Sequence, residues 1–397
     1  MSVYPPADTL AIKAGNVDMT GNANVSSNLT VSGNVGIGVA SPGAELHVAG
    51  IGAIIIPSGT TVQRPTTGVL GMIRYNTEDT ALELYNGTAW TTVDAPTPPL
   101  YTFTSHTFTN CGASGRYGPT FANMKSTYSS EIWEQNPEWF NEISGKQGFQ
   151  LWTVPKTGTY TIKAYGASGQ QRQSGSQYGY GAWTQGDFSL TQGEKLVIIV
   201  GQYYDPTITG VTVSSSNNAG GGGGASWVLR EDYGGSGAAP SSLYLVAGGG
   251  GGETANNGSN FSHSVSDAGY SQASLVTPPG TAAASGQWDS GGGASYGIDG
   301  LGAGNPGPSK GLRPYNGADG GNHGYSSSSY NNLGGFGGGG GSGAHSAGGG
   351  GGYVGGQAAA SYAGGGGYGG SSRNNGTTIT FGISYNYSHG KVIITLN

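Results

Sequence analysis

Runs of consecutive glycine are the feature that most restricts how this chain can fold. Glycine fills 81 of the 397 positions. Six tracts lie in the second half of the chain, at residues 220–224, 248–252, 291–293, 337–341, 348–352 and 364–367. A tract without side chains adds nothing to an apolar core, and ordering glycine costs more conformational entropy than ordering any other residue. The tracts are therefore either flexible linkers or parts of a structure that backbone hydrogen bonds hold together.

The position of the tracts favours the second interpretation. Two of them directly adjoin strand-like segments, in the sequences GGGGGASWVLR and LYLVAGGGGGE. A polyproline-II-like helix has about three residues per turn and no internal hydrogen bonds, so its backbone groups point outward. If every residue is glycine, several such helices can pack side by side and bond to one another. We therefore expect a lattice of polyglycine-II helices that a β-sheet stabilises at one end.

Strand-like segments occur both before and after the glycine tracts. They are residues 149–154, 158–165, 196–201, 226–230, 243–247 and 391–396. Short apolar and β-branched segments bounded by turn residues are typical of the strands of a β-sandwich. We therefore expect residues 101–397 to form one glycine-rich head. The predicted fold class is all-β and fibrous, ending in a β-sandwich that carries a polyglycine-II helix lattice.

A hexapeptide repeat begins at Gly15, with the units GNVDMT, GNANVS, SNLTVS and GNVGIG. The third and fifth places are apolar, which predicts one buried face of an extended strand. A single ribbon of this kind buries too little surface to be stable. Three copies around one axis would bury the apolar places, so we expect residues 15–50 to form the trimeric β-shaft of a homotrimer. A flexible linker with a fortuitous period is the alternative.

A small β-hairpin is predicted within residues 51–93, the collar of the molecule. Two segments that alternate apolar and polar residues flank a turn at residues 77–80. We expect the apolar places to face a shared core, and these are Ile73, Tyr75, Leu82, Leu84 and Trp90.

The same region resembles the collar of phage tail-fibre proteins. The resemblance rests on the elements GIGxxSPGAxLHV, PSGTTxQRPTTGxxGMIRYNT and LELYNGTAW, and it covers about residues 33–93. It implies a fibre of the virion that is assembled in the cytoplasm of the bacterial host. It also implies that an N-terminal attachment segment, residues 1–14, binds other virion proteins of the baseplate, tail or capsid.

Three prolines within residues 94–100 predict an extended, semi-rigid linker between the collar and the head. The predicted organisation therefore has five parts. They are the attachment segment 1–14, the shaft 15–50, the collar 51–93, the linker 94–100 and the head 101–397.

The composition argues against several partners. The net charge is −6, and Lys and Arg are scattered without a basic stripe, so neither nucleic acid nor an anionic membrane surface is expected as a partner. The longest aliphatic runs, residues 54–56 and 196–200, are too short to span a bilayer, so we expect no membrane insertion. Cys111 is the single cysteine, so no disulfide can form within the chain.

The head resembles the glycine-rich extracellular domain of the anaplastic lymphoma kinase and leukocyte tyrosine kinase receptors. The shared blocks keep the same order, and they include FTNCGASGRYGPT, GFQLWTVPKTGTYTIKAYGASG, LVIIVGQ and the closing HGKVIITLN. The resemblance implies a lattice of glycine helices built on a β-sandwich. The paired cysteines of the receptors are absent apart from Cys111, and no kinase or membrane segment is recognised here, so receptor signalling is not implied.

No motif predicts catalysis, a metal site or a cofactor, and we expect a protein that is not an enzyme. Four histidines are far apart in sequence and lack the close spacing of a zinc site, namely His263, His323, His345 and His389. The glycine tracts lack the G-K-[ST] of a phosphate-binding loop. The carboxylate pair Glu231 and Asp232 is interpreted as a solvated loop. A glycan-degrading spike is disfavoured because no β-helix repeat and no converging carboxylates are evident.

Recognition is the remaining function, and the loops between glycine helices carry the side chains suited to it. Flat, stiff aromatic rings beside hydroxyls and amides bind diverse surfaces at low entropic cost. The candidate receptor-binding residues are Tyr178, Tyr180, Trp183, Trp288, Tyr315, His323, Tyr325 and Tyr330. We expect the head to contact a host glycan or outer-membrane protein, chiefly through residues 287–330. Two alternatives remain: that these rings only cover the edges of the lattice, and that the chain is a structural capsid or neck fibre.

Overall fold

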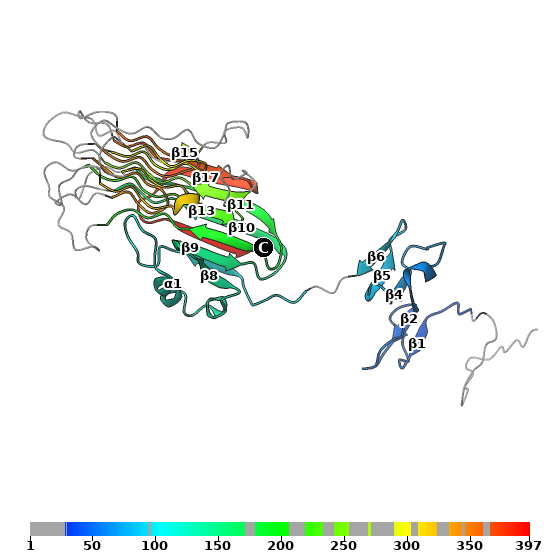
Figure 1. Cartoon of the computed structure of the whole chain (residues 1–397). Coiled ribbons are helices and arrows are strands. Elements are labelled where there is room, and N and C mark those ends of the chain that lie inside the picture. The colour runs from blue at the N-terminus through cyan, green and yellow to red at the C-terminus, as the bar shows by residue number, and fades with distance from the viewer. Residues whose placement is uncertain are drawn as a thin grey trace, which may run out of the picture. The chain divides into compact units, whose positions relative to one another are not determined.

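The chain divides into two compact units, Met1–Pro96 and Thr97–Asn397, which are described separately as the N-terminal unit and the head (Figure 1). The computed structural model describes residues 28, 30–93, 97–170, 179–205, 219–232, 242–253, 269–270, 290–302, 309–323, 333–343, 346–359 and 366–397. For residues 269–270 and 383–385 it describes the backbone alone. Within the described residues, no helix is long and apolar enough to cross a membrane.

The head is a β-sandwich of two sheets, as the sequence predicts. The five-stranded sheet has the order β17 (Thr377–Asn386), β11 (Gly181–Leu190), β10 (Gly158–Tyr165), β18 (Lys391–Leu396) and β7 (Ser105–Phe108). The seven-stranded sheet has the order β15 (Gly269–Tyr270), β16 (Ser371–Asn374), β14 (Leu243–Ala247), β13 (Ser226–Arg230), β12 (Lys195–Ile199), β9 (Lys146–Thr153) and β8 (Phe140–Ile143). All six predicted strands are present, and four of them have the predicted bounds.

An apolar core fills the space between the two sheets. Alternate residues of β10, such as Tyr160 and Ile162, point into it and are fully buried, and Ile198 of β12 meets them from the other sheet. Aromatic rings close one end of this core, where helix α1 (Phe121–Thr127) and the 3-10 turn η2 (Ile132–Gln135) place Tyr128 and Trp133 against the sandwich. The sandwich therefore holds itself together by ordinary hydrophobic burial.

The second face of the seven-stranded sheet is buried as well. Val197 and Ile199 of β12 and Trp227 of β13 lie in a separate cluster with Phe336 and Tyr353, which come from the glycine-rich segments. A strand that is buried on both faces has apolar residues at successive positions in the sequence. This explains why residues 196–200 are all apolar. This sheet is therefore the layer to which the glycine segments are attached.

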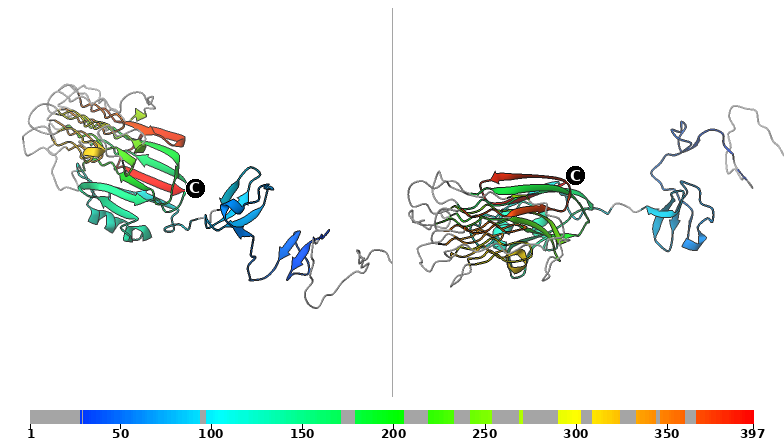
Figure 2. Two further views of the ribbon diagram at one scale, coloured as in Figure 1. Left: turned by 45° about the vertical axis from the view of Figure 1, so that its right-hand side comes forward. Right: turned by 90° about the horizontal axis from the view of Figure 1, so that it is seen from above.

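The glycine segments form the expected lattice, and they run side by side beyond the ends of the strands (Figure 1; Figure 2). The amides of Gly348 and Gly351 donate to the carbonyls of Gly220 and Gly223, at 3.1 and 3.0 Å. The intervening residues bond a different neighbour: the amides of Gly349 and Gly352 donate to Gly291 and Ala294, at 3.1 and 3.0 Å.

Residues three positions apart therefore bond the same neighbouring segment, which is the signature of a helix with about three residues per turn. The prediction of polyglycine-II helices is confirmed for the described tracts. The flexible-linker interpretation is wrong for them, because their backbone groups bond one another inside the head.

Glycine is required in this lattice because the neighbouring backbone occupies the space of a side chain. A Cβ atom on Gly251 would lie 1.9 Å from the carbonyl oxygen of Gly367, and one on Gly222 would lie 2.1 Å from that of Gly349. No rotamer change relieves such an overlap, because the backbone fixes the position of the Cβ atom and the atom that it meets is itself a backbone atom. The spacing between the segments is therefore set by the absence of side chains.

The N-terminal unit contains a four-stranded sheet of β3 (Ser58–Gly59), β4 (Ile73–Asn76), β5 (Ala81–Tyr85) and β6 (Trp90–Val93). The predicted hairpin is confirmed, since β4 and β5 pair antiparallel. A separate parallel pair joins β1 (Val35–Ile37) to β2 (Leu46–Val48). Most of the hexapeptide repeat, including residues 15–27, lies outside the described residues, so the trimeric shaft stays a prediction.

The buried face of this sheet is the opposite of the one predicted. Ile73 and Tyr75 are 51% and 39% exposed, whereas Arg74 and Asn76 between and beside them are 5% and 0% exposed. The reason is that residues 61–64, which include the turn η1 (Thr61–Gln63), cover the polar face and place Arg64 against Glu83. The expectation of a shared apolar core is therefore wrong within a single chain.

Replacing Gly251 by alanine should destabilise the head, because the new methyl group overlaps the backbone of Gly367. We expect a loss of about 1–3 kcal/mol in the free energy of unfolding, the usual range for overpacking. Gly302→Ala is the control, since its Cβ would meet nothing closer than 3.4 Å. Thermal unfolding of both variants measures the difference, and equal midpoints would contradict the packed lattice.

Acidification should weaken the head through His389. Burial lowers the pKa of His389 to about 4, against ~6.5 for an unfolded histidine. Between these values the unfolded chain takes up a proton that the folded chain does not, so stability is full above about pH 6.5 and falls as the pH drops toward 4. Acidification lowers the free energy of unfolding, and we expect this loss to be about 1–3 kcal/mol smaller in the His389→Gln variant. Thermal midpoints at pH 7 and 4.5 test this, and parallel declines in both proteins would refute it.

Candidate functional site

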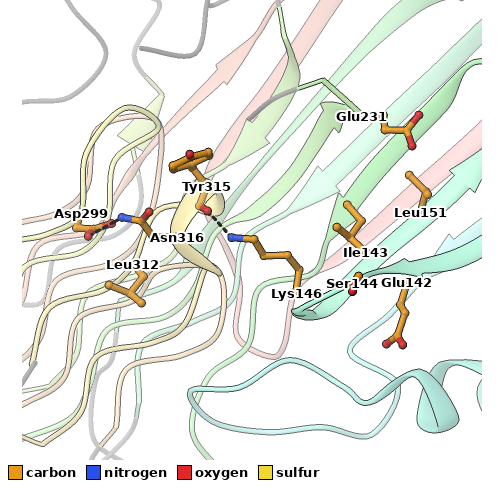
Figure 3. Close-up of a pocket in the computed structure, with 10 residues that line it drawn as sticks. All are labelled: Glu142, Ile143, Ser144, Lys146, Leu151, Glu231, Asp299, Leu312, Tyr315 and Asn316. Atoms are coloured by element: carbon orange, nitrogen blue, oxygen red, sulfur yellow. Dashed lines mark hydrogen bonds between the residues drawn. The ribbon is translucent and has the colours of Figure 1, made fainter. Parts of the chain in front are cut away.

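A pocket of about 900 Å³ opens on the head beside the turn between β8 and β9 (Figure 3). Its volume is in the range of ligand sites in proteins. The lining residues come from three places: the β8–β9 hairpin with β9, the end of β13, and two loops of the glycine-rich part. They are Glu142, Ile143, Ser144, Lys146, Leu151, Glu231, Asp299, Leu312, Tyr315 and Asn316.

One wall of the pocket is a short, well-fixed turn, the 3-10 helix η4 (Pro314–Asn316). Pro314 at its start has a restricted φ angle, and Gly317 at its end adopts a φ of 112°, which glycine accepts without strain. The Asp299 carboxylate accepts a hydrogen bond from the Asn316 amide at 2.9 Å and one from the Arg313 backbone amide at 3.0 Å. The turn is therefore held in one conformation before any ligand arrives.

Lys146 connects the hairpin to this turn. Its ammonium group donates a hydrogen bond to the carbonyl oxygen of Tyr315 and lies 5.7 Å from the centre of the Tyr315 ring (Figure 3). Arg313 lies over the same ring at 5.0 Å. Partial burial lowers the pKa of Lys146, and the nearby Asp319 opposes that shift. Tyr315 thus presents an exposed, fixed ring at the edge of the pocket.

The remaining groups of the pocket offer both polar and apolar contacts. Glu142 and Glu231 add two carboxylates, Asn316 an amide, and Ile143, Leu151 and Leu312 an apolar surface. Hydroxyl groups can donate to carboxylates and accept from an ammonium or amide group. A polyhydroxylated molecule with an apolar face is therefore the kind of ligand that this set of groups can bind.

The structure places the eight predicted recognition residues in very different surroundings. Four of them lie outside the described residues, namely Tyr178, Trp288, Tyr325 and Tyr330. Tyr315 lies at the pocket and Tyr180 is exposed just before β11. His323 is only 8% exposed, so its prediction as a surface contact is wrong. Its segment is packed within the glycine lattice, where Gly321 bonds Gly339.

Trp183 lies on a strand, so its assignment to a loop between glycine helices is wrong. It belongs to β11 and is half-buried on the face of the five-stranded sheet that points away from the core. Its indole ring lies over Gly382, where a Cβ atom would come within 2.2 Å of the indole nitrogen, and Lys163 Nζ lies 4.0 Å from the ring centre. Trp183 and Tyr315 therefore belong to different elements: Trp183 lies on the outer face of the five-stranded sheet, and Tyr315 lies on the turn η4.

Sequence reasoning missed Lys146, Asp299 and Asn316, which fix and line the pocket. Lys146 belongs to β9 and lies far from the tracts along the chain, so no spacing indicates its contact with Tyr315. One signal was present: the sequence RPYNG at residues 313–317 combines Pro and Asn-Gly, which are typical of a tight turn. Glu231, interpreted as a solvated loop residue, is exposed and also forms an ion pair with Lys195 at 3.7 Å.

Comparisons with known proteins support part of the resemblance stated above. No protein-family model matches the chain. The chain is similar to the leukocyte tyrosine kinase receptor of Mus musculus, with 37% identity over 105 residues. This match covers 26% of the chain and only 12% of the receptor. The similarity therefore concerns one segment, and the activity of the whole receptor does not follow from it.

Replacing Asp299 by alanine should loosen the wall of the pocket, because the Arg313 amide and the Asn316 side chain lose their acceptor. We expect amide exchange of Arg313 to become at least about tenfold faster, which corresponds to roughly 1.4 kcal/mol of local opening. Glu142→Ala is the control, since it removes a carboxylate of the same pocket that does not bond to the turn. Unchanged exchange in the Asp299 variant would show that the turn is held by other contacts.

Proposed function

We propose that this chain is a fibre protein of a virus that infects bacteria, and that its head attaches the virion to a receptor on the host surface. The preformed pocket beside Tyr315 is the observation that carries the attachment role. The resemblance of residues 33–93 to tail-fibre collars supports the viral origin, and the lattice supplies a rigid base for the contact surface. In this proposal the chain is a homotrimer whose N-terminal residues bind other virion proteins.

The chemistry of the pocket favours a glycan over an outer-membrane protein as the receptor. A pocket of about 900 Å³ with carboxylates, an amide, one ammonium group and an exposed tyrosine ring suits a few sugar units. Protein partners, in contrast, usually bind across a broad surface of about 800 Å² per partner. The proposed ligand is an uncharged stretch of a surface polysaccharide, since the lining carboxylates outnumber the lysine.

The alternative of a structural fibre without receptor contact has no observation of its own in its favour. A structural fibre and an attachment protein differ in whether the purified protein binds host cells. An attachment protein binds susceptible cells when purified and competes with the virus, whereas a purely structural fibre does neither.

The purified full-length protein should therefore bind susceptible cells and block infection. The double variant Lys146→Ala/Tyr315→Ala should lose at least about tenfold in apparent affinity, or roughly 1.4 kcal/mol. Tyr368→Ala is the matched control, because it removes a tyrosine that is exposed on the head but does not line the pocket. Binding to isolated surface polysaccharide identifies the receptor class. Absence of binding by the unmodified protein would refute the attachment role, while equal binding by all variants would refute only the pocket.

A further inference from the structure

In the N-terminal unit the buried side chains are polar, whereas a normal protein core is apolar. Among described residues 28–93, the buried side chains are Arg74, Asn76 and Glu83, and all three are polar. Every buried hydrophobic residue of the described chain lies in the head, from Tyr101 onward. A unit of this size without buried apolar side chains lacks the interaction that drives folding in water.

Five apolar side chains of the unit lie on one face of its four-stranded sheet. Ile73 of β4 pairs with Leu84 of β5, and Tyr75 pairs with Leu82. Leu82 in turn pairs with Val93 of β6. Directly paired residues point to the same face, so these five side chains form one patch across three strands. None of the five is buried, and none carries a charge.

The opposite face is already closed by polar contacts. Glu83 accepts hydrogen bonds from Arg64 Nε at 3.2 Å and from the Asn76 side chain at 2.8 Å. Asn76 also donates to Asp79 at 2.7 Å. Buried charges need partners of this kind, and these partners come from residues of the same chain. The charged pair Arg64 and Glu83 on the polar face is therefore matched within one copy, and the apolar face is the one left for a partner.

We infer that further copies of this chain cover the apolar face, so that the hydrophobic core of the N-terminal unit forms only between copies. The face has no charge that would select a different, charged partner. More apolar surface lies in the same unit, where Ile51, Ile54 and Ile55 in the segment before β3 are exposed to solvent. When copies assemble through this unit, each one brings both the sheet face and this segment out of water.

This inference refines the proposed homotrimer by naming its contact surface, but it does not depend on the attachment role. A closed symmetric assembly places the same patch of every copy around one axis, which suits an uncharged patch that can meet its own equivalent. The number of copies, three, comes from the proposed fibre. The surface itself follows from the burial pattern of the sheet.

Two adjacent residues of β6 provide a matched test in the full-length protein. Val93 lies on the apolar face, and Thr92 lies on the opposite face, where it pairs with Glu83. Both are exposed in a single chain, so a lysine at either position is tolerated by the monomer. We expect the unmodified protein and Thr92→Lys to have a mass of about three times 39.8 kDa. The assembly of the Val93→Lys variant should dissociate into single chains at protein concentrations at least about tenfold higher than those at which the unmodified assembly dissociates. The reason is that the variant buries an unpaired charge between copies.

Sedimentation equilibrium gives these masses, and the near-ultraviolet circular dichroism of the head shows whether each variant is folded. Tyr75→Lys should behave as Val93→Lys does, since Tyr75 belongs to the same patch. A monomeric unmodified protein, including one that binds a different virion protein through this face, would overturn the inference. Equal masses for all variants would also overturn it. Neither measurement uses host cells, so a failure here is distinct from a failure of receptor binding.

Discussion

Hydrogen bonding between bare backbone segments is the interaction on which the head depends. Each glycine segment donates to different neighbours at successive residues, so every tract is tied to several others. One such bond contributes only about 0.5–1.5 kcal/mol, and glycine loses more entropy on folding than any other residue. No single segment is stable by itself. The lattice exists because many bonds form together and because two of its tracts, at residues 220–224 and 248–252, directly adjoin ordered strands.

The seven-stranded sheet makes this cooperation possible. Its inner face belongs to the apolar core of the sandwich, and its outer face packs on Phe336 and Tyr353 from the glycine-rich part. The strand register is thus passed on to the glycine tract that precedes β13 and to the one that follows β14. The pocket lies where the β8–β9 hairpin meets this region, so its shape is set by both kinds of packing at once (Figure 3).

The two units of the chain reach stability by different routes. The head buries its apolar side chains in the usual way and adds a hydrogen-bonded lattice. The N-terminal unit instead buries Arg74, Asn76 and Glu83 and leaves Ile73 and Tyr75 in contact with solvent. Such an arrangement is unfavourable for one copy in water, because apolar surface stays hydrated while charged groups lose solvent. The inferred assembly of copies would remove this apolar surface from water.

The strands and the lattice can be predicted from the sequence alone, because both follow from local pattern. Strands such as β10 and β13 show in apolar segments bounded by turns, and the tracts beside them leave backbone bonding as the remaining means of cohesion. It did not determine which face of the β4–β5 hairpin is buried, since alternation marks two faces and only the covering segment with Arg64 decides between them. The sequence pattern also did not indicate the contact between Lys146 and Tyr315. Nor did it place Trp183 on a strand or His323 inside the lattice. Those positions depend on contacts between residues far apart in the chain, and only the tertiary structure specifies them.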